Sequence, residues 1–166
     1  MLLLPYRTQP ILHRVACRGR LQLVTALLAD TDEECERDTL DTVATHGSVE
    51  MLQLLLQHRS GNVTARAMDG AAANGHMATV VYLHENRMEG CTTAAMDAAA
   101  RHNHLDVVRF LHLHQHEGCT AAAIDGAARM GHLEMVHFLT TFRREGYTAR
   151  ALEEGTSDRG LKRPHL

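Results

Sequence analysis

Acidic side chains recur in this sequence at a fixed step of 28 residues, and they are the first residues to test for chemistry. The row consists of Asp41, Asp69, Asp97 and Asp125. Arg101 and Arg129 follow the last two by four residues, the favourable order for an ion pair along one helix face. Two interpretations stay open. The aspartates form an acidic track that binds a basic ligand or a cation, or they lie near helix starts, where a negative charge interacts favourably with the helix dipole and keeps an exposed face soluble. Hydrolysis by two acids needs unequal environments, which repeat-equivalent positions do not indicate.

Histidine is unusually frequent, with 13 residues in the chain. Five of them crowd the segment from His102 to His116, so a transition-metal site has to be considered. His112 and His114 are two residues apart and point to different faces of a helix, whereas His112 and His116 have the i, i+4 spacing. We expect structural histidines, and a His-rich metal-binding protein is the alternative.

Nucleophile motifs are missing from the sequence: it contains no GxSxG, GxxxxGK[ST], GxGxxG or HExxH. The four cysteines form no CxxC pair. Cys91 and Cys119 occupy equivalent places, and Tyr147 takes the next one, as expected of a packing position. We therefore expect free thiols, no catalytic residues, no metal and no cofactor, so the chain is not predicted to be an enzyme.

The formal net charge is 17 − 20 = −3, which argues against a nucleic-acid partner held by phosphate neutralisation. No run reaches 18 apolar residues, so we expect no membrane span. The apolar start Met1–Leu4 ends at Pro5 and lacks the basic residues and the length of a signal peptide. We expect an intracellular, cytoplasmic protein, with a nuclear location as the alternative.

The elements that must position these residues repeat with the same period. Glu89-Gly90-Cys91-Thr92 returns 28 residues later as Glu117-Gly118-Cys119-Thr120. In the unit 91–118, Thr92 is suited to cap a helix over 94–101, Asn103 to close it, and Leu105 to begin a second helix that runs to His114. The units span about 7–34, 35–62, 63–90, 91–118 and 119–146, followed by a truncated unit 147–156.

Columns of apolar residues define the predicted core. The second-helix column Val24, Leu52, Val80, Val108 and Val136 has no polar member, and neither does the first-helix column of Ala16, Ala44, Ala72, Ala100 and Ala128. One unit cannot bury such stripes by itself, whereas stacked units form a continuous core. The sequence predicts an all-α solenoid of helix-turn-helix repeats over 7–156, with a lead-in at 1–6 and a disordered tail at 157–166.

These residues resemble ankyrin repeats. The segment 103–111, Asn-His-Leu-Asp-Val-Val-Arg-Phe-Leu, is similar to the ankyrin Gly-His-Leu-x-Val-Val-x-x-Leu segment, and Ala71-Ala72 is similar to the family's Ala-Ala pair. The ankyrin unit has about 33 residues. The repeats here are shorter, and the loss falls where ankyrins carry a β-hairpin finger, so we expect tight loops instead.

The resemblance implies a non-catalytic scaffold or adaptor that binds another protein through side chains beside the constant core. The residues predicted to contact the partner are Arg66, Asp69, Arg87, Asp97, Arg101, His116, Asp125, Arg129 and Arg144. The abrupt start of the first unit leaves two further alternatives: a piece of a larger ankyrin-repeat array, or self-association through uncapped ends. The sequence does not identify the partner.

Overall fold

The computed structural model describes residues 11–30, 37–58 and 62–142. Within these ranges the chain forms ten helices and no strand. They are α1 (Ile11–Ala16), α2 (Leu21–Asp30), α3 (Arg37–Thr45), α4 (Val49–His58), α5 (Ala65–Ala73), α6 (Met77–Asn86), α7 (Thr93–Arg101), α8 (Leu105–His114), α9 (Ala121–Arg129) and α10 (Leu133–Phe142).

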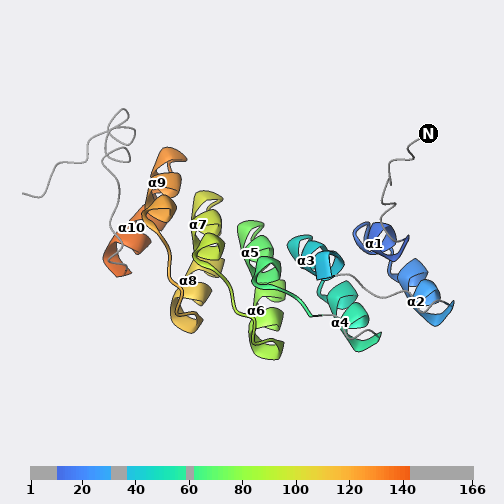
Figure 1. The fold of residues 1–166 in the computed structure, drawn as a ribbon. Helices are drawn as coiled ribbons and strands as arrows, with labels where there is room; N and C mark the ends of the chain where they lie inside the picture. Colours follow the sequence, from blue (N-terminus) through green and yellow to red (C-terminus); the bar gives the residue numbers. More distant parts are fainter. Residues whose placement is uncertain (1–10, 31–36, 59–61, 143–166) are drawn as a thin grey trace, which may run out of the picture.

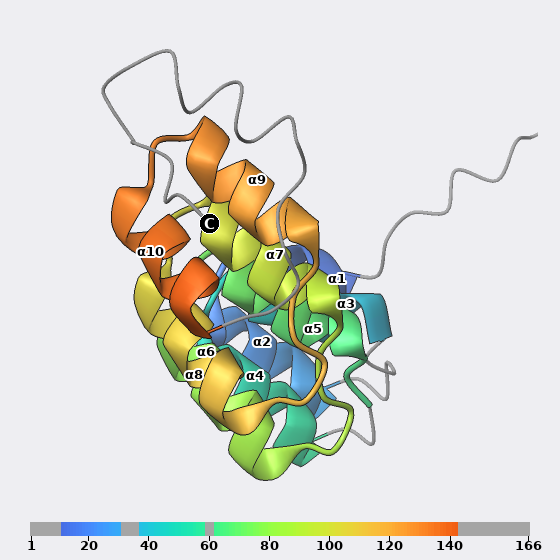
Figure 2. The same cartoon turned by 90° about the vertical axis from the view of Figure 1, so that its left-hand side faces the viewer.

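The helices form an extended two-layer stack rather than a closed bundle (Figure 1). The odd-numbered helices make one layer and the even-numbered helices the other, which is plain when the stack is seen from one end (Figure 2). We call them the first-helix layer and the second-helix layer. Each helical hairpin packs on the hairpins before and after it, so the predicted all-α solenoid is confirmed.

Local signals set the helix boundaries where the sequence predicts them. Thr92 is extended, and its hydroxyl oxygen accepts a hydrogen bond from the backbone N–H of Ala94 at 3.2 Å, which caps the start of α7. Asn103 adopts a left-handed backbone with φ of 65° and turns the chain between α7 and α8. The expected helix over 94–101 differs from the observed α7 by one residue at its start.

The predicted columns form the core. Val24, Leu52, Val80 and Val108 are fully buried, and so are Ala44, Ala72 and Ala100. The last members of the two columns, Val136 and Ala128, are half-buried in the final described hairpin. Alanine is required where first helices approach closely, because a larger side chain would push neighbouring helices apart. One close approach is at Gly70 in α5, where a Cβ would overlap the side chain of Thr45 in α3.

The two inter-unit loops that the structure describes in full are short and carry no β-hairpin finger. Residues 87–92 connect α6 to α7 and residues 115–120 connect α8 to α9, and neither contains a strand. Gly90 and Gly118 have φ of 67° and 72°, which lets each loop turn sharply. The expectation of tight loops in place of the β-hairpin is confirmed for these units.

Several expectations fall outside the described residues. They are the lead-in at 1–6, the truncated unit at 147–156 and the disordered tail at 157–166. Among the described helices, none is long and apolar enough to cross a bilayer.

Candidate functional site

The row of aspartates links each unit to the next. Oδ1 of Asp97 accepts a hydrogen bond from the backbone N–H of Thr120 at 2.8 Å, and Oδ2 accepts one from the Thr120 hydroxyl at 2.6 Å. The same hydroxyl oxygen accepts from the N–H of Ala122 at 3.1 Å and so caps α9. The carboxylate of one first helix therefore holds the capping residue of the following first helix. We call this arrangement the inter-unit clamp.

The clamp repeats with nearly constant geometry. Asp69 accepts from the N–H and the hydroxyl of Thr92 at 2.8 and 2.7 Å. Asp41 accepts from the same groups of Thr64 at 2.9 and 2.6 Å. Hydrogen bonds to an ionised acceptor are shorter and stronger than neutral ones, so these carboxylates fix the spacing and orientation of the first-helix layer.

This geometry corrects part of the sequence interpretation. Asp97 was expected to pair with Arg101 on its own helix, but no ion pair joins them, because both oxygens of Asp97 bind the next unit. An ion pair that the sequence analysis does not predict joins Arg109 in α8 to Glu134 in α10 at 3.3 Å. An acidic track for a cation is weakened where the clamp engages the carboxylates.

A cleft opens on the first-helix layer across α1, α3 and α5. Its volume is about 520 Å³. Two of the residues predicted to contact a partner, Arg66 and Asp69, line it. The remaining lining residues are His13, Asp38, Asp41, Thr42, Thr45 and Gly70, none of which the sequence singled out as a partner contact.

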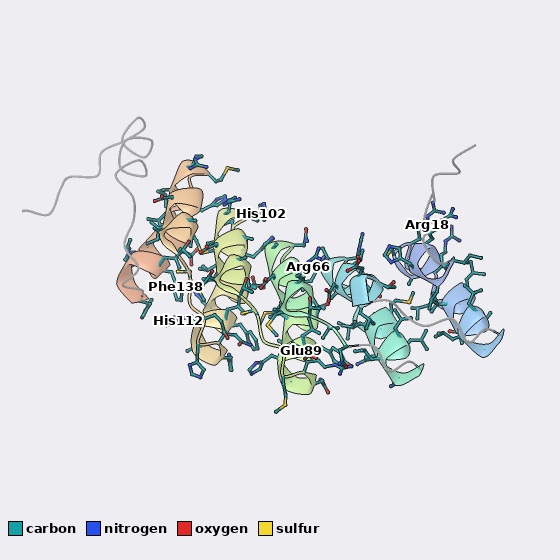
Figure 3. All side chains as sticks on the ribbon, in the orientation of Figure 1. Arg18, Arg66, Glu89, His102, His112 and Phe138 are labelled. Atoms are coloured by element: carbon teal, nitrogen blue, oxygen red, sulfur yellow. The ribbon has the colours of Figure 1, made fainter. Side chains whose placement is uncertain are left out.

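The cleft presents charges that the fold does not use. The guanidinium of Arg66 and the carboxylate of Asp38 make no hydrogen bond or ion pair with any residue that the structure describes, and both residues are exposed. Figure 3 shows the Arg66 side chain in the first-helix layer. Because both carboxylate oxygens of Asp41 and Asp69 are already bonded within the stack, Arg66 and Asp38 are the groups available to an incoming ligand.

The other predicted contact residues do not gather into one patch with this cleft. Arg101 is exposed at the end of α7, where its side chain lies against Gly126 of α9; a Cβ built there would be 3.2 Å from the Arg101 Cβ. Arg87 and His116 follow the ends of α6 and α8 in the second-helix layer. Asp125 and Arg129 lie on α9. Arg144 lies outside the described residues.

Histidines of the Gly-His turns interlock neighbouring units. The ring of His104 lies so close to Gly75 of the preceding turn that a Cβ there would overlap it, and His76 meets Gly47 in the same way. The pKa of His104 is lowered, mainly by burial and next by the neighbouring His102. A neutral imidazole packed on a backbone is a structural role, as expected for these residues.

Two further histidines of the crowded segment, His112 and His114, pack against phenylalanine rings. His114 stacks on Phe110 with ring centroids 4.3 Å apart, and His112 meets Phe138 edge-on with centroids 5.6 Å apart. Figure 3 labels His112 and Phe138 at the end of the stack that carries α10. No group of three His, Cys, Asp or Glu side chains able to hold a metal occurs among the described residues. The His112–His116 pair therefore gains no third ligand from the described part of the chain.

The described cysteines have the features of packing residues. Cys91 and Cys119 are buried, and Cys17 is half-buried. Burial is the main cause that raises the pKa of Cys91 to about 12, with smaller effects of Glu117 and Asp69. Such a thiol carries almost no thiolate at neutral pH, the form that a nucleophile or a metal ligand requires.

Comparison with known proteins identifies the repeat. A family model described as "Ankyrin repeats (many copies)" matches residues 68–112 and again 96–140. Residues 68–140 are ankyrin repeats. A search of the solved structures found similarity to the human ASB11 ankyrin repeat domain, with a TM-score of 0.61 and 16% identity over 90% of this chain and 93% of that one. At that identity the likeness shows the shared ankyrin-repeat solenoid fold. A search of the curated proteins found no match.

Proposed function

We propose that this ankyrin-repeat protein is a non-catalytic adaptor that binds a protein partner on its first-helix layer, centred on the cleft across α1, α3 and α5. Ankyrin repeats are generally protein-interaction modules. The single observation that supports the cleft as the centre is a hollow of about 520 Å³ lined by a cation, Arg66, and an anion, Asp38, whose charged groups have no ion-pair partner among the described residues.

The mechanism is presentation of side chains at fixed spacing. The inter-unit clamps and the buried alanine column hold the first helices rigidly, so little conformational freedom is lost when a partner binds. Arg offers a planar fork with five donors, which suits a carboxylate or a backbone carbonyl of the partner. Asp38 supplies the complementary site for a basic side chain. We infer a partner segment that carries both charges.

An intracellular location is part of this proposal. Cys17, Cys91 and Cys119 form no disulfide among the described residues, and a reducing compartment keeps cysteines in that state. The raised pKa values of Cys17 and Cys91 make these thiols slow to oxidise, which is consistent with structural rather than redox roles.

The test is a binding measurement on partners selected with the intact chain. Peptides selected from a display library are titrated against the native protein and against the double charge reversal Asp38→Arg with Arg66→Glu. We expect the reversal to weaken binding by about tenfold or more, because like charges are then placed against the partner.

A matched reversal on the other layer serves as the control. Arg109→Glu with Glu134→Arg also exchanges one cation and one anion, but at an exposed ion pair of the second-helix layer. We expect this variant to bind within about twofold of the native chain. If the two reversals weaken binding equally, or if only the control reversal does, the cleft is not the binding site.

A further inference from the structure

The first hairpin leaves apolar side chains uncovered at positions that every later unit buries. Ile11 in α1 is 60% exposed, whereas the equivalent Thr39, Ala67, Ala95 and Ala123 are at most 1% exposed. Leu23 in α2 is 53% exposed, whereas Met51, Thr79, Val107 and Met135 are fully buried. We call the surface around Ile11 and Leu23 the N-terminal end face.

In the later units, the residues equivalent to Ile11 and Leu23 are buried by packing between neighbouring units. The hydroxyl of Thr39 lies 2.8 Å from Nδ1 of His13 in the preceding unit, so the Thr39 position is at the contact between two units. The equivalent Ile11 has no preceding hairpin among the described residues. A shallow hollow of about 320 Å³ adjoins Leu23 and is lined also by Gly19, Arg20, Leu21 and Gln22.

We propose that the chain's own segment Met1–Leu4 docks on the N-terminal end face and caps the solenoid. Four consecutive apolar residues, Met-Leu-Leu-Leu, stand within the ten residues before α1. Leaving both this segment and the end face in water is unfavourable, and bringing them together removes apolar area from water on both sides.

The length of the connection permits this docking. Six residues lie between Leu4 and Ile11, and the seven Cα–Cα steps that join them reach up to about 25 Å. The longer helix of the end face, α2, has ten residues and a length of about 15 Å. The segment therefore reaches every part of the face. Pro5 and Pro10 restrict the backbone of the connection, which lowers the entropy lost on docking.

A second copy of the chain fits the face less well. Two neighbouring helices of six and ten residues offer roughly 15 by 20 Å, or about 300 Å². A stable interface between separate proteins buries about 800 Å² on each partner. A tethered segment needs no such area, because the tether gives it an effective concentration in the millimolar range.

A double-mutant cycle between segment and face tests the proposal. Leu23→Ser is measured in the native chain and in a chain carrying Leu2→Ser, Leu3→Ser and Leu4→Ser, by urea unfolding. We expect Leu23→Ser to lower the folding equilibrium constant by about fivefold or more in the native chain and by less than about twofold in the triple variant. Leu113→Ser, at a residue that is 75% exposed on α8, is the control and should show the same effect in both backgrounds.

The other outcomes overturn the proposal. Equal effects of Leu23→Ser in the two backgrounds mean that Met1–Leu4 does not cover this face. Light scattering of the native chain over a hundredfold concentration range distinguishes the second copy: we expect a constant monomer mass, and a dimer that Leu23→Ser dissociates assigns the face to self-association instead. If Leu23→Ser prevents folding, Leu23→Ala takes its place in the same cycle.

Discussion

The inter-unit clamp makes a quantitative prediction for the pair Asp97 and Thr120. Asp97→Ala removes one acceptor of two hydrogen bonds, at 2.8 and 2.6 Å, that cross between units. A hydrogen bond to a charged group contributes about 1.5–3 kcal/mol. Asp97 is half-buried and Thr120 is exposed, so water replaces part of the loss. We expect Asp97→Ala to lower the free energy of unfolding by about 1–3 kcal/mol.

A double-mutant cycle isolates the clamp from other effects of the substitution. Thr120→Val removes the hydroxyl while keeping the shape of the side chain, and also removes the cap of α9, which contributes about 1 kcal/mol. Urea unfolding of both single variants and the double variant measures the coupling between them, which we expect to be about 1 kcal/mol. Arg101→Ala, on the same helix but outside the clamp, is the control. A coupling indistinguishable from zero would refute the clamp as a stabilising contact.

Three further predictions concern packing and titration. Gly70→Ala should destabilise the protein by about 1–3 kcal/mol in thermal unfolding, despite the better helix propensity of alanine, because the new Cβ would overlap the side chain of Thr45. Gly126→Ala is the control, since its Cβ would lie 3.2 Å from the Cβ of Arg101, and its stability should be within about 1 kcal/mol of the native protein. Because the pKa of His104 is lowered by folding, the folded state binds fewer protons than the unfolded state below about pH 6.5. The stability contributed by neutral His104 is therefore fully present above about pH 6.5 and is lost as the pH falls toward the folded-state pKa. We expect His104→Asn to flatten the decline in the free energy of unfolding between about pH 7 and 5. Cys91, with a pKa of about 12, should resist alkylation by iodoacetamide at pH 8 in the folded protein and react in urea, as followed by peptide mass spectrometry; equal rates would contradict its burial.

The fold was predictable because each level of the sequence agrees with the others. The 28-residue period, the caps at Thr92 and Thr120 and the apolar columns all indicate stacked hairpins, and the structure has them. In the unit 91–118 the observed helix boundaries differ from the expected ones by one residue at most, because Thr and Asn determine where a helix begins and ends.

The role of the aspartates was less accessible from the sequence, although a signal is present. Asp41, Asp69 and Asp97 are each followed 23 residues later by a threonine, and this is the pair that forms the clamp. The i, i+4 spacing along one helix instead suggests that the partner of Asp97 is Arg101, four residues later on the same helix. The competing partner in the next unit prevails because it offers two donors at once, a backbone N–H and a hydroxyl.

The cleft itself could not be derived from residue types. It depends on the small Gly70 in α5 and on the placement of α1 beside α3, both of which are properties of the assembled stack. The sequence did single out Arg66 and Asp69, because they vary beside a constant core. It missed Asp38, which lies three residues before the clamp residue Asp41 and faces the same cleft.

The most direct measurement of the proposed function is a map of backbone amide chemical shifts while a selected peptide is added to the isotope-labelled chain. Binding at the cleft predicts that the amides of Asp38, Thr42, Arg66 and Gly70 shift most, with small changes along α8 and α10. Shifts confined to the second-helix layer, or to the loops 87–92 and 115–120, would contradict binding on the first-helix layer.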